Sequence, residues 1–350
     1  MSSNKQIKAM VVDDAAFMRK QLVEIISNSD EIDVVGVARH GKEALEAIEI
    51  LKPDVITLDV DMPVMDGITT IKHIMIRSPV PVVMVSGLAD QSRITFEALR
   101  LGAIDFFPKP SGTISKDIVK NSDELIKTLK VAARSNLKAI KRAHLSNKDV
   151  NKDAFPLKNI QGILVIVAGH GSISGLIRLL MNIRGLSNLG VICVQDLSIN
   201  ILRSFGAELR KIVNCKVYNG QELQLKTGQC VLISEALLPV LNSKSEGLFL
   251  KGHATCLKGF FSSISSHFDK NNLALSILGG KKPDDIDAYR TLAKNNCEIF
   301  FLAPESCPCS ELSAVLKNEK IGFVMKNEYE MCHKIHAYSR RLILECLSKN

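Results

Sequence analysis

The stretch LDVDMPVMDG, residues 58–67, decides the fold of the first half of the chain. Two aspartates, Asp59 and Asp61, come just after the run DVIT, which is rich in β-branched residues, and just before a Met-Pro pair. Such a run favours a strand that ends at the aspartates. Asp66 and Gly67 are interpreted as a turn that starts a helix. The aspartates are then either ordinary surface charges or a place where a carboxylate does chemistry.

Strand-like and helix-like segments alternate around this stretch. Amphipathic segments such as AFMRKQLVEIIS (16–27) and GKEALEAIEILK (41–52) separate short apolar runs. These runs are IKAMVV (7–12), DVVGVA (33–38), DVITL (54–58), PVVMV (81–85) and AIDFF (103–107). Their order predicts a parallel sheet with helices on both faces. Ligands bind such sheets at the carboxyl ends of the strands.

Chemically distinctive side chains follow the predicted strands at that edge. They are Asp13 and Asp14 after the first strand, Asp59 after the third, Ser86 after the fourth and Lys109 after the fifth. Three close carboxylates repel one another unless a cation lies among them. Oxygen ligands with room for water suit Mg²⁺, at distances of about 2.0–2.1 Å. Because a lysine and a hydroxyl can hold phosphoryl oxygens, the pattern predicts that Asp59 accepts a phosphoryl group as an acyl phosphate.

These residues and their spacing resemble the receiver domain of two-component response regulators. The resemblance covers about residues 5–130 and rests on VVDDAAFMRK, LDVDMPVMDG, VMVSGLAD and EALRLGAIDFFPKPSG. It implies that a histidine kinase phosphorylates Asp59. It also implies a metal site formed by Asp13, Asp14, Asp59 and the backbone carbonyl of Asp61, phosphoryl contacts from Ser86 and Lys109, and a switch aromatic at Phe106.

Length and composition indicate a second domain. The chain has 350 residues, of which 46% are hydrophobic, and this exceeds what one domain usually needs. No apolar run reaches the about 18 residues of a membrane span, and the first residues lack the apolar core of a signal peptide. We therefore expect a cytoplasmic protein without membrane insertion. The nine cysteines, all at or after Cys193, are interpreted mainly as buried thiols.

A basic segment, KTLKVAARSNLKAIKRAH at residues 127–144, supplies much of the net charge of +8. It has no interleaved aromatic residues, so we interpret it as a solvated helix and linker and expect no nucleic-acid binding.

The predicted organisation is a receiver domain at residues 1–130, a linker at 131–160 and an effector domain at 161–350. An effector that binds nucleic acid or another protein stays an alternative.

A second alternating series begins at GILVIVAG, residues 162–169. It continues through LGVICV (189–194), QCVLIS (229–234), LALSIL (273–278) and EIFFLA (298–303). The predicted fold class is α/β in two domains, each a mainly parallel sheet with helices on both faces. The first domain is expected to be flavodoxin-like and the second to be of the Rossmann type.

The whole chain resembles the chemotaxis protein-glutamate methylesterase (CheB) family. The residues FFPKPSG (106–112) and the linked α/β domain carry this resemblance. It implies an effector that cleaves glutamate methyl esters on the cytoplasmic domains of chemoreceptors and can deamidate glutamines, through a Ser-His-Asp triad. It also implies a partner kinase of the chemotaxis type.

The effector departs from that triad. In GHGSISG the nucleophile position holds Ser172, but Ser174 replaces a glycine that lets backbone donors approach the oxyanion. The histidine position after VICVQ holds Asp196, whose ordinary pKa of about 3.9 makes it a poor base at neutral pH. Asp284 aligns with the triad aspartate, and His170 is the candidate replacement for the histidine. Ser172 and Asp284 also fit helix N-caps.

Besides the alternative of an effector that binds nucleic acid or another protein, two functions stay open. The first is a phosphorylation-controlled response regulator whose effector has lost most or all catalytic activity. The second is an active methylesterase and glutaminase with a rearranged site around Ser172.

Overall fold

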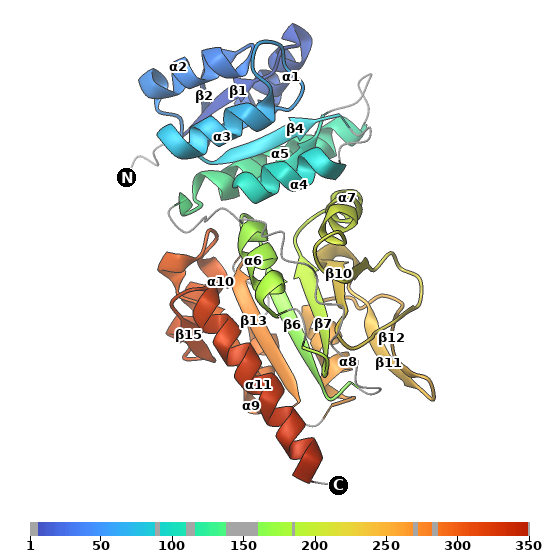
Figure 1. Cartoon of the computed structure of the whole chain (residues 1–350). Helices are drawn as coiled ribbons and strands as arrows, with labels where there is room; N and C mark the ends of the chain where they lie inside the picture. The colour runs from blue at the N-terminus through green and yellow to red at the C-terminus, as the bar shows by residue number, and fades with distance from the viewer. Residues whose placement is uncertain are drawn as a thin grey trace. The chain divides into compact units, whose positions relative to one another are not determined.

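Two parallel sheets organise the chain, one in each of its units, Met1–Arg142 and Ala143–Asn350 (Figure 1). The structure, a computed structural model, describes residues 6–87, 92–109, 116–137, 160–183, 186–268, 272–281 and 286–348. Helices pack on both faces of each sheet. The predicted α/β fold class with two mainly parallel sheets is confirmed.

The first unit contains a five-stranded sheet in the order β2-β1-β3-β4-β5, in which every neighbouring pair is parallel. Its elements are β1 (Ile7–Val12), α1 (Ala16–Ser27), β2 (Ile32–Ala38), α2 (Gly41–Leu51), β3 (Val55–Asp59), α3 (Gly67–Arg77), β4 (Val82–Ser86), α4 (Ser92–Leu101), β5 (Asp105–Pro108) and α5 (Lys116–Ala133). The central strands β3 and β4 are buried along their whole length. Continuous burial explains why their sequences are apolar runs and do not alternate.

Helices α1 and α5 cover one face of this sheet. Leu22 and Ile26 of α1 and Leu125 and Leu129 of α5 are fully buried in one core with the sheet. Helices α2, α3 and α4 lie side by side on the other face (Figure 1). Helix α5 reaches into the segment that was expected to be a linker, and residues 138–159 of that segment lie outside the described residues.

Side-chain caps fix the start of two of these helices. The carboxylate Oδ1 of Asp66 accepts a hydrogen bond from Thr69 N at 2.7 Å, and α3 begins at Gly67. This confirms the helix-starting turn predicted at Asp66 and Gly67. At α2 the imidazole Nδ1 of His40 accepts from Glu43 N at 3.2 Å. Both caps satisfy backbone N–H groups that the first helical turn leaves without partners.

The second unit contains a seven-stranded parallel sheet in the order β15-β14-β13-β6-β7-β10-β8. Its elements are β6 (Gly162–Ala168), α6 (Ile173–Ile183), β7 (Leu189–Gln195), α7 (Ile199–Leu209), β8 (Cys215–Val217), β9 (Leu223–Gln224), β10 (Cys230–Ser234), η2 (Glu235–Leu237), β11 (Val240–Lys244), β12 (Gly247–Lys251), α8 (Leu257–Ser265), β13 (Leu273–Gly279), α9 (Asp287–Lys294), β14 (Glu298–Leu302), η3 (Pro304–Ser306), α10 (Glu311–Asn318), β15 (Phe323–Met325) and α11 (Glu328–Ser348). The short antiparallel sheet β11-β12-β9 was not predicted.

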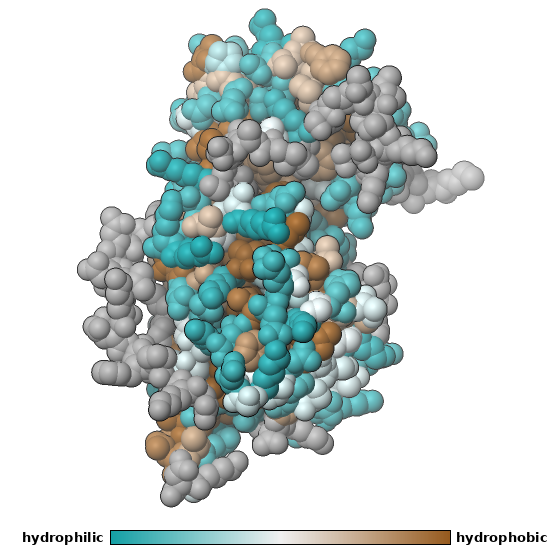
Figure 2. Space-filling view, turned by 90° about the vertical axis from the view of Figure 1, so that its right-hand side faces the viewer, coloured by the Kyte–Doolittle hydropathy of each residue, from teal (hydrophilic) through white to brown (hydrophobic). Residues whose placement is uncertain are grey.

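Apolar side chains of the second unit are concentrated in its interior. Strands β6, β7 and β13 are buried at every residue, and Phe260, Phe261 and Tyr289 from α8 and α9 pack against that sheet. The face shown in Figure 2 is mainly hydrophilic, with hydrophobic colour in small areas. No helix in the described part of the chain combines the length and apolar character needed to cross a membrane.

We expect Leu22→Ala to lower the free energy of unfolding of the first unit by about 2–5 kcal/mol, because it empties a fully buried position in α1. Urea denaturation of the full chain, followed by circular dichroism, measures this loss. The control is Ile50→Ala on α2, where the side chain is 80% exposed, and a change within about 0.5 kcal/mol is expected. Equal losses in both variants would contradict this description of the core.

Candidate functional site

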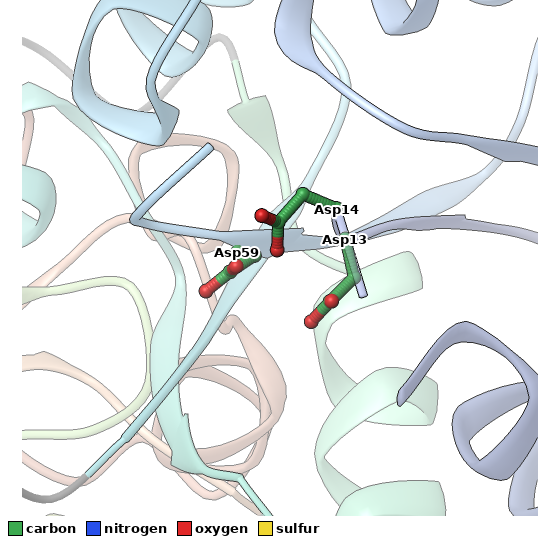
Figure 3. A group of neighbouring side chains, drawn as sticks. All are labelled: Asp13, Asp14 and Asp59. Carbon is green, nitrogen blue, oxygen red and sulfur yellow. The ribbon is translucent and has the colours of Figure 1, made fainter. Parts of the chain in front are cut away.

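Three aspartates meet at the carboxyl edge of the first sheet. Asp13 and Asp14 follow β1 and Asp59 ends β3, and these two strands are neighbours. One carboxylate oxygen from each lies within 4.8 Å of the others (Figure 3). Asp13 and Asp59 are buried and Asp14 is exposed. The sequence-predicted convergence of these side chains is therefore present in the structure.

Lys109 bridges the two buried carboxylates. Its Nζ lies 2.9 Å from Asp13 Oδ2 and 2.9 Å from Asp59 Oδ2. The backbone N–H of Lys109 donates to Ser86 O at 2.8 Å, which holds the residue at the end of β5 beside β4. A single ammonium group thus offsets part of the repulsion between two buried negative charges.

Burial and neighbouring charges change the pKa values of Asp59 and Lys109. Burial raises the pKa of the Asp59 carboxyl, and the charge of Asp13 acts in the same direction, so together they outweigh the opposing effect of Lys109. Burial acts to lower the pKa of Lys109, but its contacts with Asp13 and Asp59 outweigh burial and raise it. Lys109 therefore stays protonated at neutral pH, while ionising Asp59 costs more free energy in the folded chain than in the unfolded chain.

A glycine lets the loop after β3 fold closely against the strand end. A Cβ atom on Gly67 would lie 2.1 Å from the backbone oxygen of Asp59, and the Gly67 N–H donates to Val60 O at 2.8 Å. Val64 in this loop has a φ of 68°, which is uncommon for a β-branched residue. Asp61 is an exposed residue of the same loop.

The other residues predicted for this site lie at the same edge or just below it. Asp59 is the register partner of Val85, so Ser86 follows one residue beyond it on β4. Ser86 is buried, and the ring of Phe106 on β5 is buried too. Their contacts with a phosphoryl group and the switching of Phe106 stay predictions.

The donor set fits a magnesium ion. Carboxylates are the hard oxygen ligands that Mg²⁺ prefers, and two ligands of one such ion lie at most about 4.2 Å apart. The three aspartate oxygens, within 4.8 Å of one another, are close to that size. Asp59 Oδ1 already accepts a hydrogen bond from Val60 N at 2.7 Å, which fixes the orientation of its carboxylate.

A second charged group lies at the carboxyl edge of the second sheet. His170 follows β6, Asp196 follows β7 and Lys281 follows β13, and these strands are neighbours. His170 Nε2 lies 2.9 Å from Asp196 Oδ2, and Lys281 Nζ forms an ion pair with the same oxygen. Asp196 thus faces two basic side chains.

Those contacts keep Asp196 ionised. Burial acts to raise the pKa of its carboxyl, but the hydrogen bond and charge of His170, together with Lys281, hold the pKa well below the usual range. A carboxylate in this state is a very weak proton acceptor, so Asp196 is not suited to act as a general base at neutral pH.

Ser172 lies directly before α6 but is hidden. Its side chain is buried, with the residue 2% exposed, and Oγ donates to the backbone oxygen of Leu278 at 3.1 Å. A Cβ on Gly279, whose φ is 139°, would lie 3.0 Å from that hydroxyl. Ser172 occupies the position of an N-cap, as one interpretation predicted, while its hydroxyl bonds across to β13. Asp284, the predicted third member, lies outside the described residues.

The two halves of the chain match two known families. Residues 9–120 match the response regulator receiver domain and residues 164–329 match CheB methylesterase. A protein-glutamate methylesterase/protein-glutamine glutaminase of Caldanaerobacter subterraneus is 36% identical over 311 residues, which cover 83% of this chain and 85% of that protein. The chain belongs to the CheB family.

Two further CheB-family proteins are similar over shorter lengths. A protein-glutamate methylesterase/protein-glutamine glutaminase of Bacillus licheniformis is 53% identical over 133 residues, which are 38% of this chain and 37% of that protein. The solved response regulator domain of Thermotoga maritima CheB is 45% identical and covers 37% of this chain and 97% of that chain, with a TM-score of 0.34. The two family matches and the Caldanaerobacter relative identify the chain as a CheB-like response regulator with a receiver and a methylesterase domain.

Lys281 of this CheB-family domain was missed at the level of sequence. The run GGKK after a predicted strand was the available signal, since charged residues that follow a parallel strand gather at the ligand-binding edge. Its pairing with Asp196 depends on the strand order β13-β6-β7, which the local sequence does not specify.

We expect Asp59→Asn to stabilise the first unit at pH 7 without divalent cations. Because the pKa of Asp59 is raised in the folded state, the unfolded chain loses its proton first and stability falls as the pH rises through the folded value. The asparagine side chain of the variant does not ionise, so the variant keeps its stability as the pH rises. The difference in stability between the variant and wild type should therefore shrink as the pH falls toward about 3.9. Thermal unfolding from pH 7 to pH 4 measures it.

The control for this comparison is Asp33→Asn, which removes an exposed carboxylate from β2. An Asp59→Asn variant that is less stable than wild type at pH 7 would show that the Lys109 ion pair outweighs burial and repulsion, contrary to the expectation.

Proposed function

We propose that a histidine kinase of the chemotaxis type phosphorylates Asp59 in the presence of Mg²⁺, and that this input controls the methylesterase-like domain. The observation that carries the proposal is the position of Lys109 Nζ, which lies 2.9 Å from a carboxylate oxygen of Asp13 and 2.9 Å from one of Asp59. The carboxylate of Asp14 lies at the same edge of the sheet. A buried carboxylate beside a cation and two further carboxylates has the features that acyl-phosphate formation needs.

The residues have separable tasks in this reaction. Asp59 Oδ1 is held by Val60 N–H, so Oδ2 is the oxygen that attacks phosphorus as the bond from phosphorus to the donor breaks. Lys109 then transfers its ion pair from Oδ2 to a phosphoryl oxygen, and the Ser86 hydroxyl donates to another. Mg²⁺, held by Asp13, Asp14, Asp59 and the Asp61 carbonyl, would supply charge neutralisation.

We also propose that the effector has lost most or all ester hydrolysis and acts by binding chemoreceptor cytoplasmic domains. Two observations support this. Asp196, which is predicted to stand at the position of the triad histidine, is held ionised by His170 and Lys281. The hydroxyl of Ser172 is buried and donates to Leu278 O. In one serine hydrolase, loss of the histidine alone costs roughly 10⁶ in rate.

A second candidate is an active methylesterase and glutaminase with a rearranged site. The contact between His170 and Asp196 favours it, because a carboxylate on Nε2 would orient the imidazole and leave Nδ1 as the base. Ser172 would first have to give up its bond to Leu278 O. This requirement makes loss of activity the preferred proposal.

Labelling by a small phosphodonor tests the phosphorylation site. We expect Asp59→Asn to abolish Mg²⁺-dependent labelling, since it removes the attacking oxygen's charge. The control is Asp66→Asn in the same loop, where an asparagine still caps α3, and labelling close to wild type is expected. Labelling of Asp59→Asn at the wild-type rate would refute the site.

Methanol release from methylated chemoreceptor membranes tests the effector. With Asp59 phosphorylated, we expect the wild-type chain to release methanol no faster than Ser172→Ala, because the hydroxyl of Ser172 is hydrogen-bonded to Leu278 O and Asp196 is a very weak base. Release that is clearly faster than in Ser172→Ala, and lost again in His170→Gln, would instead establish the rearranged site. An Asp196→His variant that gains release would assign the loss of activity to that one position.

A further inference from the structure

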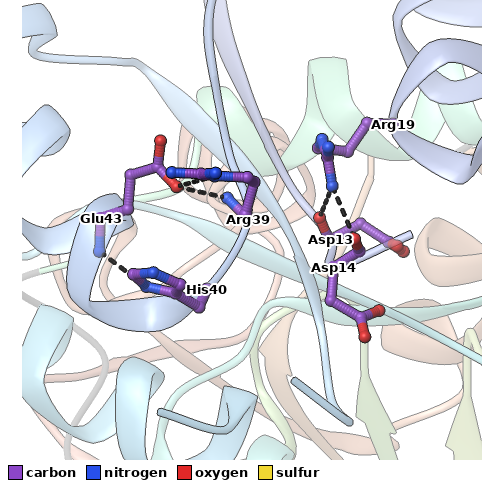
Figure 4. Close-up of polar contacts among 6 residues, drawn as sticks. All are labelled: Asp13, Asp14, Arg19, Arg39, His40 and Glu43. Carbon is purple, nitrogen blue, oxygen red and sulfur yellow. Dashed lines mark hydrogen bonds and ion pairs between the residues drawn. The ribbon is translucent and has the colours of Figure 1, made fainter. Parts of the chain in front are cut away.

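Arg19 holds the turn that carries two of the three carboxylates. It lies in the first turns of α1 with its side chain half-buried, and its Nη1 donates to Asp13 O at 2.7 Å and to Asp14 O at 2.8 Å (Figure 4). One guanidinium nitrogen thus binds two consecutive backbone carbonyls. These hydrogen bonds to a charged donor are the stronger kind.

The two carbonyls belong to the two peptide planes that flank the Cα of Asp14. Peptide groups are planar and rigid, so fixing both planes fixes φ and ψ of the residue between them. The direction of the Cα–Cβ bond of Asp14 is then fixed as well. Arg19 therefore sets the direction in which the Asp14 side chain leaves the backbone, and so limits the positions that its carboxylate can reach.

Asp14 needs such a restraint more than its neighbour does. Asp13 is buried, its N–H donates to Ala38 O at 3.1 Å, and its Oδ1 accepts from Ala15 N at 2.9 Å. Asp14 is exposed, and repulsion from Asp13 and Asp59 favours its movement toward solvent. A clamp on its backbone lowers the ordering cost that a cation would otherwise meet on binding.

We propose that Arg19 is a positioning residue for divalent-cation binding at Asp13, Asp14 and Asp59. This inference rests on the proposed function, because it requires that the acidic group binds Mg²⁺. Residues that orient metal ligands typically change affinity by about 10–100-fold when they are replaced. The charge of Arg19 acts in the opposite direction, since a nearby cation repels Mg²⁺. Positioning and simple charge therefore predict effects of opposite sign.

Calorimetric titration of the full chain with Mg²⁺ tests the proposal. We expect Arg19→Met to bind Mg²⁺ about tenfold more weakly than wild type, and Arg19→Lys to lie between them, since an ammonium can reach part of the same acceptor pair. The matched control is Arg39→Met. Arg39 is 69% exposed and pairs with Glu43 in the same region (Figure 4), so its loss should leave affinity unchanged or slightly tighter.

Labelling by a small phosphodonor at increasing Mg²⁺ gives a second readout. In Arg19→Met the half-saturating Mg²⁺ concentration should rise by a similar factor, while the rate at saturating Mg²⁺ stays close to wild type. A merely structural role would instead lower the maximal rate and the melting temperature without moving the half-saturating concentration.

The outcomes separate this inference from the function it rests on. If wild type binds no Mg²⁺, the proposed metal site fails and this inference fails with it. If wild type binds and Arg19→Met binds equally or more tightly, only the role of Arg19 is overturned. Equal weakening in Arg39→Met overturns it too. If Arg19→Met does not fold, wild-type affinity in Arg19→Lys overturns it.

Discussion

In a parallel sheet every strand ends at the same edge, and both units of this chain collect their charged side chains through that constraint. The carboxyl ends of β1, β3 and β5 bring Asp13, Asp59 and Lys109 within ion-pair distance. The ends of β6, β7 and β13 do the same for His170, Asp196 and Lys281. Continuous apolar strands supply the buried sheet, so polar chemistry is left to the residue that follows each strand.

The two edges differ in how their charge is balanced. At the first edge three carboxylates face one lysine, and the pKa of Asp59 is raised. That edge has more negative charge than its own cation offsets, and this excess is the electrostatic basis for the proposed divalent ion. At the second edge one carboxylate faces two basic groups, and the pKa of Asp196 is lowered. The charge of Asp196 is already compensated by these two groups. The hydroxyl of the neighbouring Ser172 is buried and donates a hydrogen bond to Leu278 O.

Sequence reasoning was most successful where a residue's role follows from its place after a strand. It predicted both parallel sheets, the turn at Asp66 and Gly67, and the convergence of Asp13, Asp14, Asp59 and Lys109. It missed the antiparallel sheet β11-β12-β9, whose strands, such as VLNSK and GLFLK, are not continuous apolar runs, and it missed Lys281. The hydroxyl of Ser172 was weighed as nucleophile or helix cap, and its bond to Leu278 O was outside both alternatives.

The sequence by itself determined the α/β class, the family and the identity of the side chains at each strand end. These features depend on hydrophobic periodicity and on the spacing of nearby residues, which are local properties of the sequence. It also gave the prediction that Asp196 stands where the resemblance places a catalytic histidine. Only the tertiary structure decided that Asp196 pairs with both His170 and Lys281, that Ser172 is buried, and that Arg19 holds the backbone on both sides of Asp14. These contacts join side chains to partners whose positions depend on strand order, loop path and rotamer, which local sequence patterns do not specify.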